Sequence, residues 1–314
     1  MPPCSQAEAG MIERTPILNL VTQLVLFVGL VVALAPFVFV AIAATHDLRD
    51  VNLVPMPLLP GHNFIDNLAT AWHRAGLGPK LVNSLIFAGG VAIGKVVVSA
   101  FTAYAIVFFR FPGRQLLFWS IFVTLMLPLE VRIVPTYAVA ANVLGPYQAI
   151  LDITGITSLV EALSGIRLDL QFGLLNSYPG LILPLVATAT GTFLYRQFFL
   201  TLPDELVEAA KMDGAGPIRF FFDIVLPLSR NNIAALATIM FLWAWNQYLW
   251  PLLVTTEPEH ATAVTALKSL IPNEGGIPEW NVAMAGTLIV MLPTLIVVIV
   301  MQRWFVRGLI ASEK

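Results

Sequence analysis

The chain has 314 residues, of which 58% are hydrophobic and only 11% charged, and its formal net charge is −2. Soluble domains carry about 25% charged residues, so this composition excludes an ordinary globular protein and favours a membrane protein. The near-neutral charge argues against a nucleic-acid partner. The one cysteine and four scattered histidines predict neither a disulfide nor a metal site, and we expect no cofactor.

Six segments are long and apolar enough to cross the hydrocarbon core as helices, which takes about 20 residues each. In chain order they are Ile17–Ala44, Leu81–Phe109, Leu116–Tyr137, Tyr178–Tyr195, Asn231–Thr255 and Trp280–Gln302. The first is too long for the core of a cleaved signal peptide, so we expect it to remain as a span, with Met1 or Met11 as the start. The predicted fold class is an all-α polytopic membrane protein.

Aromatic and basic side chains near the span ends predict how the chain lies in the membrane. Tyrosine and tryptophan are expected at the interfaces, here at Trp119, Tyr178, Trp250 and Trp280. Basic residues concentrate on one side if both termini are cytoplasmic. That side then holds Arg14, Arg110, Arg114, Arg196, Lys211, Arg219, Arg230, Arg303, Arg307 and Lys314.

This orientation predicts a transmembrane domain over residues 17–303, flanked by cytoplasmic tails at 1–16 and 304–314. Two outer segments are long, 46–80 and 138–177. Within the second, around 144–172, the stretch ITSLVEAL predicts a short amphipathic helix at the outer surface.

The inner loop at 201–229, between the fourth and fifth expected spans, has the sequence TLPDELVEAAKMDGAGPIRFFFDIVLPLS. Thr201 is the expected helix cap, with an early proline and acidic residues in the first turn. Leu206, Ala209 and Ala210 then share one apolar face. We expect this helix to lie across the membrane surface.

A second short helix is predicted after the glycines that end the first. Gly214 can adopt a positive φ, which stops the first helix, and Pro217 is a favourable first residue for the second. Ile218, Phe221 and Phe222 are expected to share one face of it. Two short helices joined in this way suit the groove of a partner protein.

The spacing in this loop resembles the EAA motif of ABC-importer permeases without a gap. Glu208-Ala209-Ala210 is followed after three residues by Gly214, and after nine more by Ile224 and then Leu226-Pro227. In that family the loop is a coupling helix that docks into a cleft of the ATPase. The resemblance therefore implies that Glu208, Ala209, Ala210, Asp213 and Gly214 contact an ATPase. A loop that only orients two spans is the alternative interpretation.

Other segments are similar to the sugar (maltose-type) class of these permeases. They are MLP at 126–128, PTY at 135–137, WNQYLWPLL at 245–253 and FVRGL at 305–309. Within the class, residues 11–314 resemble the E-type permease subunit of the sn-glycerol-3-phosphate (Ugp-type) importer. The stretch around 144–172 departs from it and looks like an insertion.

The resemblance implies a set of partners in a bacterial inner (plasma) membrane. They are a second permease subunit in a heterodimer, two copies of an ABC ATPase, a soluble extracytoplasmic binding protein and membrane lipid. The chain itself would be a transport subunit that moves its solute by alternating access, and not an enzyme. Glycerol 3-phosphate, a glycerophosphodiester and a neutral sugar or oligosaccharide remain open as substrates.

Three charged residues fall within the expected spans, where each costs several kcal/mol unless paired or hydrated. They are Lys95 in the second span and Glu130 and Arg132 in the third. In one interpretation Lys95 or Arg132 attracts a phosphate ester. In the other, which we weight more heavily, Glu130 forms a structural bridge to Lys95.

Polar residues in the fifth span are further candidates for the substrate pathway. Asn246 and Gln247 suit either helix packing or contact with a polyol, whereas Thr188, Thr190 and Thr192 in the fourth span favour packing.

Other functions fit the sequence less well. The segment GGVAIGK at 89–95 has the spacing of a P-loop, but it lies in an apolar span and lacks the required Ser or Thr, so no ATP site is expected there. An ion-driven transporter would show an inverted repeat, and none is visible. A membrane enzyme would need a catalytic constellation, and only His46 with Asp47 and Asp50 forms an acidic-histidine cluster.

Overall fold

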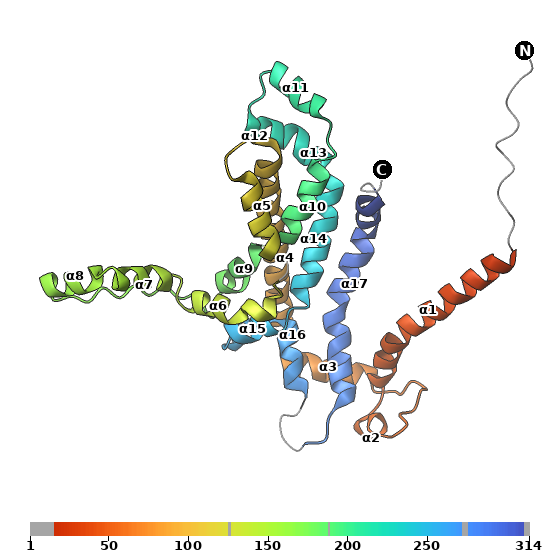
Figure 1. Ribbon diagram of the computed structural model, residues 1–314. Helices are drawn as coiled ribbons and strands as arrows, with labels where there is room; N and C mark the ends of the chain where they lie inside the picture. The colour runs from red at the N-terminus through yellow and green to blue at the C-terminus, as the bar shows by residue number, and fades with distance from the viewer. Residues whose placement is uncertain (1–15, 125–126, 188, 272–275, 311–314) are drawn as a thin grey trace, which may run out of the picture.

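A computed structural model describes the chain apart from residues 1–15, 125–126, 188, 272–275 and 311–314. Every regular element in the described residues is helical, as predicted (Figure 1). The elements are α1 (Pro16–Ala43), α2 (Leu48–Val51), α3 (Phe64–Ala75), α4 (Leu77–Phe108), α5 (Arg114–Val123), α6 (Leu129–Ala141), α7 (Gly145–Ile153), α8 (Ile156–Ser164), α9 (Tyr178–Val186), α10 (Ala189–Phe199), α11 (Asp204–Met212), α12 (Pro217–Phe220), η2 (Phe221–Val225), α13 (Leu226–Leu228), α14 (Arg230–Trp245), α15 (Leu249–Val254), η3 (Pro258–His260), α16 (Ala263–Ala266), η4 (Leu267–Leu270) and α17 (Trp280–Ile310). Cys4, Met1 and Met11 lie outside the described residues.

Three helices are long and apolar enough to cross a membrane: α1, α4 and α17. Two bent pairs also qualify by length and composition. The pair α9 and α10 bends by 46°, and the helical stretch Pro217–Leu228 meets α14 at 75°. The described residues therefore support three spans, or up to five if each bent pair counts as one, instead of six continuous helices.

The third expected span, Leu116–Tyr137, is not one helix. It divides into α5 and α6, and Pro128, in an extended conformation with ψ 156°, precedes α6. Proline lacks a backbone N–H and restricts its neighbours, so an unbroken helix through this point is disfavoured. The fifth expected span is also shorter than predicted, because α14 ends at Trp245 and α15 begins separately at Leu249.

The bundle is organised around α4, which packs against α9, α10 and α14, while α14 packs in turn against α17. Three apolar clusters follow one another along the molecule. The cluster nearest α11 includes Tyr104, Tyr195 and Phe221, the middle one Phe87, Leu181 and Trp250, and the third Leu77, Leu270 and Val290. Trp250 is fully buried and donates its indole N–H to the Leu181 carbonyl at 3.1 Å, so this side chain packs within the protein.

Small residues on α4 allow the close approach of α9. A Cβ on Gly90 would lie 2.6 Å from Ile182 Cδ1, and one on Gly94 would lie 2.6 Å from Val186 Cγ2. A Cβ on Gly89 would meet nothing within 4 Å. The glycines that resemble a P-loop in sequence are thus helix-packing residues at Gly90 and Gly94, the usual role of small residues between membrane helices.

A buried amide network joins three segments at the end of the molecule opposite α11. Asn67 Nδ2 on α3 donates to the carbonyls of Ala44 at 2.9 Å and His46 at 2.8 Å. Asn67 Oδ1 accepts from Asn281 Nδ2 on α17 at 2.9 Å. A surface ion pair joins Arg74 of α3 to Glu279, the residue before α17. The end of α1, α3 and α17 are therefore held together by polar contacts as well as by apolar packing.

Helix α1 stands apart from the bundle over most of its length (Figure 1). Residues 17–39 are all exposed, and burial begins only near its end, at Ala43 and Ala44. Its contacts with the rest of the chain are chiefly with α17 and are made near that end. A 28-residue apolar helix that leaves its sides uncovered is suited to contact with lipid or with another membrane chain.

Candidate functional site

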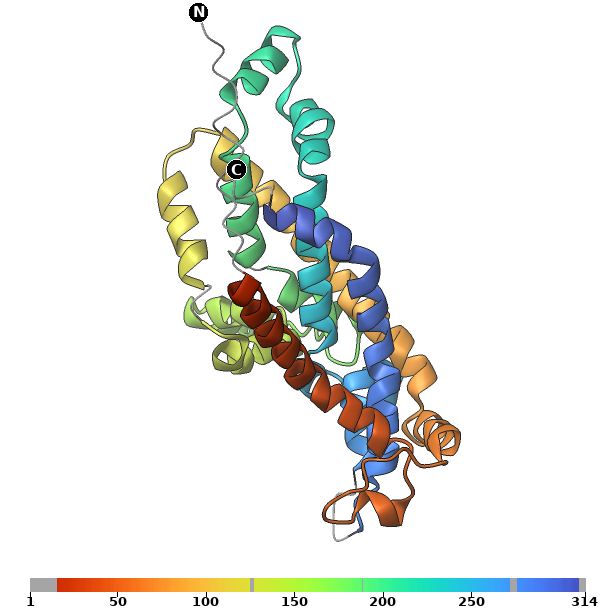
Figure 2. The same ribbon diagram turned by 90° about the vertical axis from the view of Figure 1, so that its right-hand side faces the viewer.

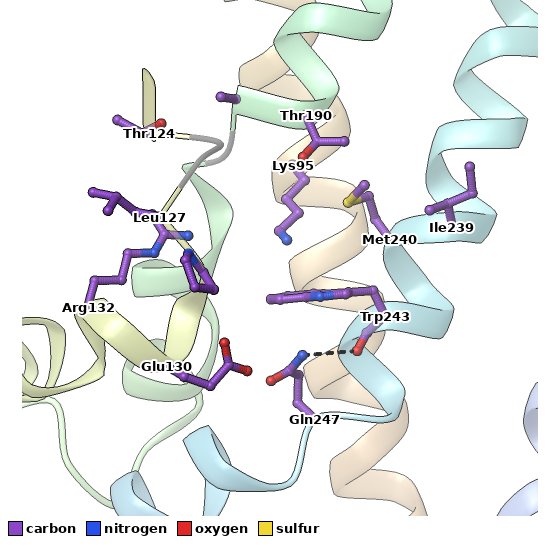
Figure 3. A pocket seen from close by; sticks show the side chains of 12 residues that line it. Lys95, Thr124, Leu127, Glu130, Arg132, Thr190, Ile239, Met240, Trp243 and Gln247 are labelled. Carbon is purple, nitrogen blue, oxygen red and sulfur yellow. Dashed lines mark hydrogen bonds between the residues drawn. The ribbon is translucent and has the colours of Figure 1, made fainter. Parts of the chain in front are cut away.

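A cavity of about 380 Å³ lies among α4, α10, α14 and the segment that joins α5 to α6 (Figure 3). It is lined by Lys95, Thr124, Leu127, Pro128, Glu130, Arg132, Ala189, Thr190, Ile239, Met240, Trp243 and Gln247. The break between α5 and α6 brings Glu130 and Arg132 to this cavity. The structure thus collects four of the five predicted pathway residues in one place.

Lys95 is held on the α4 wall of the cavity by an aromatic ring. Its side chain is only 3% exposed, and its Nζ lies 3.5 Å from the centre of the Trp243 ring. A cation over the face of tryptophan is attracted by the electron-rich ring, and more strongly where water is excluded. The ring stabilises the ammonium group without neutralising its charge.

Arg132 lies on the opposite wall from Lys95 (Figure 3). It is half-buried, and its Nε is buried without a hydrogen-bond partner in the described part of the chain. A buried donor that stays unpaired costs about 1–3 kcal/mol, and more on a charged group. The guanidinium group therefore retains unused capacity to bind an anion.

Glu130 does not pair with either cation in the described residues. The ion pairs found there are His46–Asp50, Arg74–Glu279 and Arg219–Asp223, so the expected Glu130–Lys95 bridge is not formed. The Glu130 side chain instead points toward Gln247 (Figure 3). Gln247 donates to the Trp243 carbonyl at 3.4 Å. The cavity therefore also offers the carboxylate of Glu130 and the amide of Gln247, side by side.

Asn246 is the predicted pathway residue that does not line this cavity. It caps the end of α14, its side chain donates to the Leu242 carbonyl at 2.8 Å, and it is exposed. Trp243 is the important lining residue that the sequence did not suggest. It precedes Gln247 by four residues, a spacing that would place both side chains on one face of the expected fifth span and could have identified it.

The threonines of the fourth expected span have different surroundings. Thr190 lines the cavity, whereas Thr192 is buried at 3% exposed, and Thr188 lies outside the described residues. Between them, a Cβ on Gly191 would collide with the Ser99 hydroxyl. Packing against α4 accounts for Gly191 and Thr192, and Thr190 adds a hydroxyl to the cavity.

The 201–229 loop forms two short helical stretches at one end of the molecule (Figures 1 and 2). The first, α11, begins at Asp204 after Pro203 and carries acidic residues in its first turn, as expected. Thr201 is not its cap, because its hydroxyl donates to the Phe198 carbonyl at 2.7 Å and so belongs to the preceding helix. Gly214 adopts φ +72°, the left-handed conformation predicted to end α11.

The exposed face of α11 carries most of the motif residues. Ala210 is buried at 5% exposed, while Glu208, Ala209, Asp213 and Gly214 are all exposed. Ala209 and Ala210 were expected to share one apolar face. In the structure Ala210 is buried and Ala209 is exposed, so they do not. The neighbouring Met212 is 83% exposed, an unusual environment for so apolar a side chain. This surface offers two acids and an apolar side chain to a partner.

The second stretch of the loop is anchored by aromatic packing. Pro217 begins α12, as predicted, and its carbonyl accepts a 2.7 Å hydrogen bond from the Tyr104 hydroxyl. Phe220 and Phe221 are buried, but Ile218 is 76% exposed, so the predicted Ile218 face is wrong. The wider turn of η2 shifts the helical register after Phe220, which sequence spacing cannot anticipate.

The His46 cluster folds the chain near α2. His46 is buried, its Nε2 lies 2.9 Å from the Pro57 carbonyl, and Asp47 caps α2 by accepting from the Asp50 N–H at 2.7 Å. In the residues that the structure describes, three or more His, Cys, Asp or Glu side chains nowhere group as metal ligands would. The cluster therefore has a structural explanation.

Comparison with known proteins gives consistent matches. Residues 95–311 match the family described as binding-protein-dependent transport system inner membrane component. The sn-glycerol-3-phosphate transport system permease protein UgpE of Pectobacterium atrosepticum is 48% identical over 310 residues, which cover 97% of this chain and 100% of that protein. The UgpE proteins of Yersinia pestis and Escherichia coli are each 46% identical with the same coverage.

The fold is also found in a solved structure. A crystal structure of a bacterial ABC transporter involved in the import of the acidic polysaccharide alginate contains a chain that matches with a TM-score of 0.71 at 18% identity. The match covers 97% of this chain and 100% of that chain. At this identity the likeness concerns the fold.

Proposed function

The chain belongs to the family of binding-protein-dependent inner-membrane transport components, and on this premise we propose that it moves sn-glycerol 3-phosphate or a glycerophosphodiester. It is a permease, a transport subunit of an ABC importer rather than an enzyme. Relatives that are nearly half identical over their full length are named for sn-glycerol-3-phosphate transport, which supports this choice of substrate.

The observation that carries the proposal is the pair of cations in the cavity. Lys95 and Arg132 lie on opposite walls, and neither forms an ion pair with a carboxylate in the described residues. A phosphate ester would be attracted to both charges, and arginine can hold two phosphate oxygens at once. Glu130, Thr190 and Gln247 would meet the hydroxyl groups of the glycerol moiety.

The proposed assembly contains a second permease subunit, two ABC ATPase subunits and an extracytoplasmic binding protein. The exposed face of α11 supports an ATPase contact through Glu208, Ala209, Asp213 and Gly214, with Ala210 packed behind them. In this arrangement the cavity described above would be half of a larger pathway. The second permease subunit would complete it.

The proposed orientation puts both termini and the 201–229 loop in the cytoplasm. The distribution of basic residues supports this topology. Figure 1 supports it as well, because α17 runs from the end opposite α11 toward the end that carries α11. The cytoplasmic tails would then be 1–16 and 304–314, with the domain of 17–303 between them.

The mechanism that follows is alternating access. The binding protein delivers the solute at the outer face, and ATP binding draws the two ATPase subunits together. The 201–229 loop transmits this motion to α14, which carries Trp243 and Met240 of the cavity. Hydrolysis then resets the permease. The residues of this chain bind, orient and release the solute and perform no covalent chemistry.

The test is the ATPase activity of the complete complex, reconstituted with its second permease, ATPase and binding protein. We expect glycerol 3-phosphate or a glycerophosphodiester to stimulate hydrolysis, and maltose to have no effect. Stimulation by the sugar alone would overturn the substrate and favour a permease for a neutral sugar or oligosaccharide. ATP-independent uptake driven by an ion gradient would contradict the proposal at the level of mechanism.

A further inference from the structure

The helices α7 and α8, with the irregular return segment 165–172, form an arm of residues 144–172 that projects sideways from the bundle (Figure 1). Neither helix contributes to the three apolar clusters of the described chain. The arm leaves the bundle at the end of α6, the helix that carries Glu130 and Arg132.

The arm is an ordered extension of α6. The Val143 N–H donates to the Phe172 carbonyl and the Leu174 N–H to the Ala140 carbonyl, both at 2.8 Å. Gln148 Nε2 donates to the Leu168 carbonyl, and its Oε1 accepts from the Leu170 N–H, both at 3.0 Å. These bonds connect the return segment to the end of α6 and to α7, so the arm is tied to α6.

In the arm a polar side chain is turned inward and the apolar side chains are turned outward, the opposite of the arrangement in a soluble protein. In α7 the half-buried Gln148 faces the return segment, whereas the outer face is apolar, with Tyr147 62%, Ile150 58% and Ile153 86% exposed. In α8 a second apolar face is uncovered, with Leu159 59% and Leu163 80% exposed. On ordinary soluble surfaces exposed apolar side chains are scattered singly, whereas here they form continuous faces. Such faces are unfavourable in water.

The height of the arm along the axis of the helix bundle indicates which part of the membrane surrounds it. Figures 1 and 2 both show the arm at about the level of the end of α14, in the half of the molecule away from α11. The 16 residues of α14 rise about 24 Å from Arg230, a basic residue suited to a membrane boundary. The hydrocarbon core is about 30 Å thick. The arm therefore lies near the opposite boundary of the core, and it runs across the direction of α4 and α14 (Figure 1).

We propose that the arm of residues 144–172 lies in the membrane interface, with the apolar faces of α7 and α8 inserted among the lipid chains; that this is the outer leaflet rests on the orientation in the proposed function. Amphipathic helices adopt this position when one face is apolar and the other polar. Tyr147 suits the headgroup level. Asp152, Glu161, Arg167 and Asp169 provide no basic cluster, so the contact is with acyl chains and does not select anionic lipid. The arm would fix the height of α6, and hence of Arg132, in the membrane.

The experiment uses spin labels in the complete complex. Because Cys4 is the one cysteine of the chain, Cys4→Ser gives a background for single labels. Ile153→Cys and Leu163→Cys label the apolar faces, and Ser158→Cys and Glu161→Cys are matched controls on the polar side of α8. All four positions are exposed, so a label fits without repacking. The complexes are reconstituted in nanodiscs of phosphatidylethanolamine and phosphatidylglycerol, and solute uptake in vesicles of the same lipids checks their folding.

Collision rates with oxygen, which enriches in lipid, and with a polar nickel chelate distinguish the environments. We expect labels at 153 and 163 to favour oxygen over the chelate several-fold more than labels at 158 and 161. High chelate access at all four positions would place the arm in water and overturn the proposal. Immobile labels at 153 and 163 that neither reagent reaches would show that a protein subunit covers these faces, and would overturn it equally.

Discussion

The ammonium Nζ of Lys95 lies 3.5 Å from the centre of the Trp243 ring, so a cation on α4 is joined to an aromatic side chain on α14 across the wall of the cavity. We predict that Trp243→Leu lowers the thermal unfolding midpoint of the purified complex, because a desolvated cation–π contact contributes about 2 kcal/mol. Trp243→Phe, which keeps a ring face, should lose less.

A double-mutant cycle separates this contact from simple packing. In a Lys95→Met background the charge is absent, so Trp243→Leu should cost clearly less than in the wild type. An equal loss in both backgrounds would show that the tryptophan acts through its volume alone.

The second prediction concerns the two unpaired cations. Lys95→Met and Arg132→Met should each reduce uptake of glycerol 3-phosphate at least tenfold, since each removes a charge that attracts the phosphate. Asn246→Ala is the control, because Asn246 does not line the cavity and its side chain bonds only its own helix. Uptake assays in vesicles containing the complete complex give the comparison. Unchanged uptake by both methionine variants would refute phosphate binding in this cavity.

Gly214 and Gly216 provide a matched pair in the 201–229 loop. Gly214 has φ +72°, whereas Gly216 has φ −71° and caps α12, where an aspartate is favourable. We predict that Gly214→Asp keeps ATP hydrolysis but loses uptake, because a charged side chain enters the surface proposed to meet the ATPase and a side chain at this positive φ strains the end of α11. Gly216→Asp should retain both activities. Hydrolysis and uptake are measured on the same vesicles, and normal uptake by Gly214→Asp would contradict the docking role.

The fourth prediction concerns the stability contributed by Asn67, at the end of the molecule opposite α11. Asn67→Leu should destabilise the complex by about 2–4 kcal/mol, because the carbonyls of Ala44 and His46 lose a buried donor. Asn63→Ala is the control, since the Asn63 side chain makes no capping hydrogen bond at the start of the same helix. Thermal unfolding of the two variants decides the matter, and equal midpoints would show that the network is not stabilising.

The glycines of α4 yield a last prediction. Gly94→Ala should destabilise the bundle by about 1–3 kcal/mol, because the added methyl group meets the branched side chain of Val186. Gly89→Ala adds the same methyl group to the same helix where nothing lies within 4 Å, and it should be tolerated. Comparable stability of the two variants in a denaturation assay would show that α9 can move away from α4 without cost.

The elements that were predicted correctly depend on local chemistry. Continuous apolarity is sufficient for α1, α4 and α17, and glycine and proline punctuate the 201–229 loop at Gly214 and Pro217 as expected. The family resemblance of the EAA motif agrees with the family match of residues 95–311. These signals lie within a few residues of the feature they determine.

The features that were missed depend on contacts between distant segments. The break before α6 was not recognised because Pro128 lies inside an apolar run that otherwise reads as one span. Trp250 is buried and donates its indole N–H to a carbonyl of α9, a contact that sequence spacing does not report. Likewise, Lys95, Arg132 and Gln247 were identified one by one as polar residues in apolar segments. Their convergence, and the participation of Trp243, required the packing of α4 against α14.

Because of the 75° bend before α14, a rotation of the preceding helical stretch would tilt α14 about its first residues. Trp243 lies 13 residues beyond Arg230 on an unbroken helix, which corresponds to about 20 Å along the axis. A tilt of about 10° at the bend would therefore displace the Trp243 backbone by roughly 3.5 Å, close to its ring's distance from Lys95. A small rotation of the loop is thus amplified into a displacement large enough to separate the ring from the ammonium group. The emptying of the cavity and the movement of the loop would then be one mechanical event.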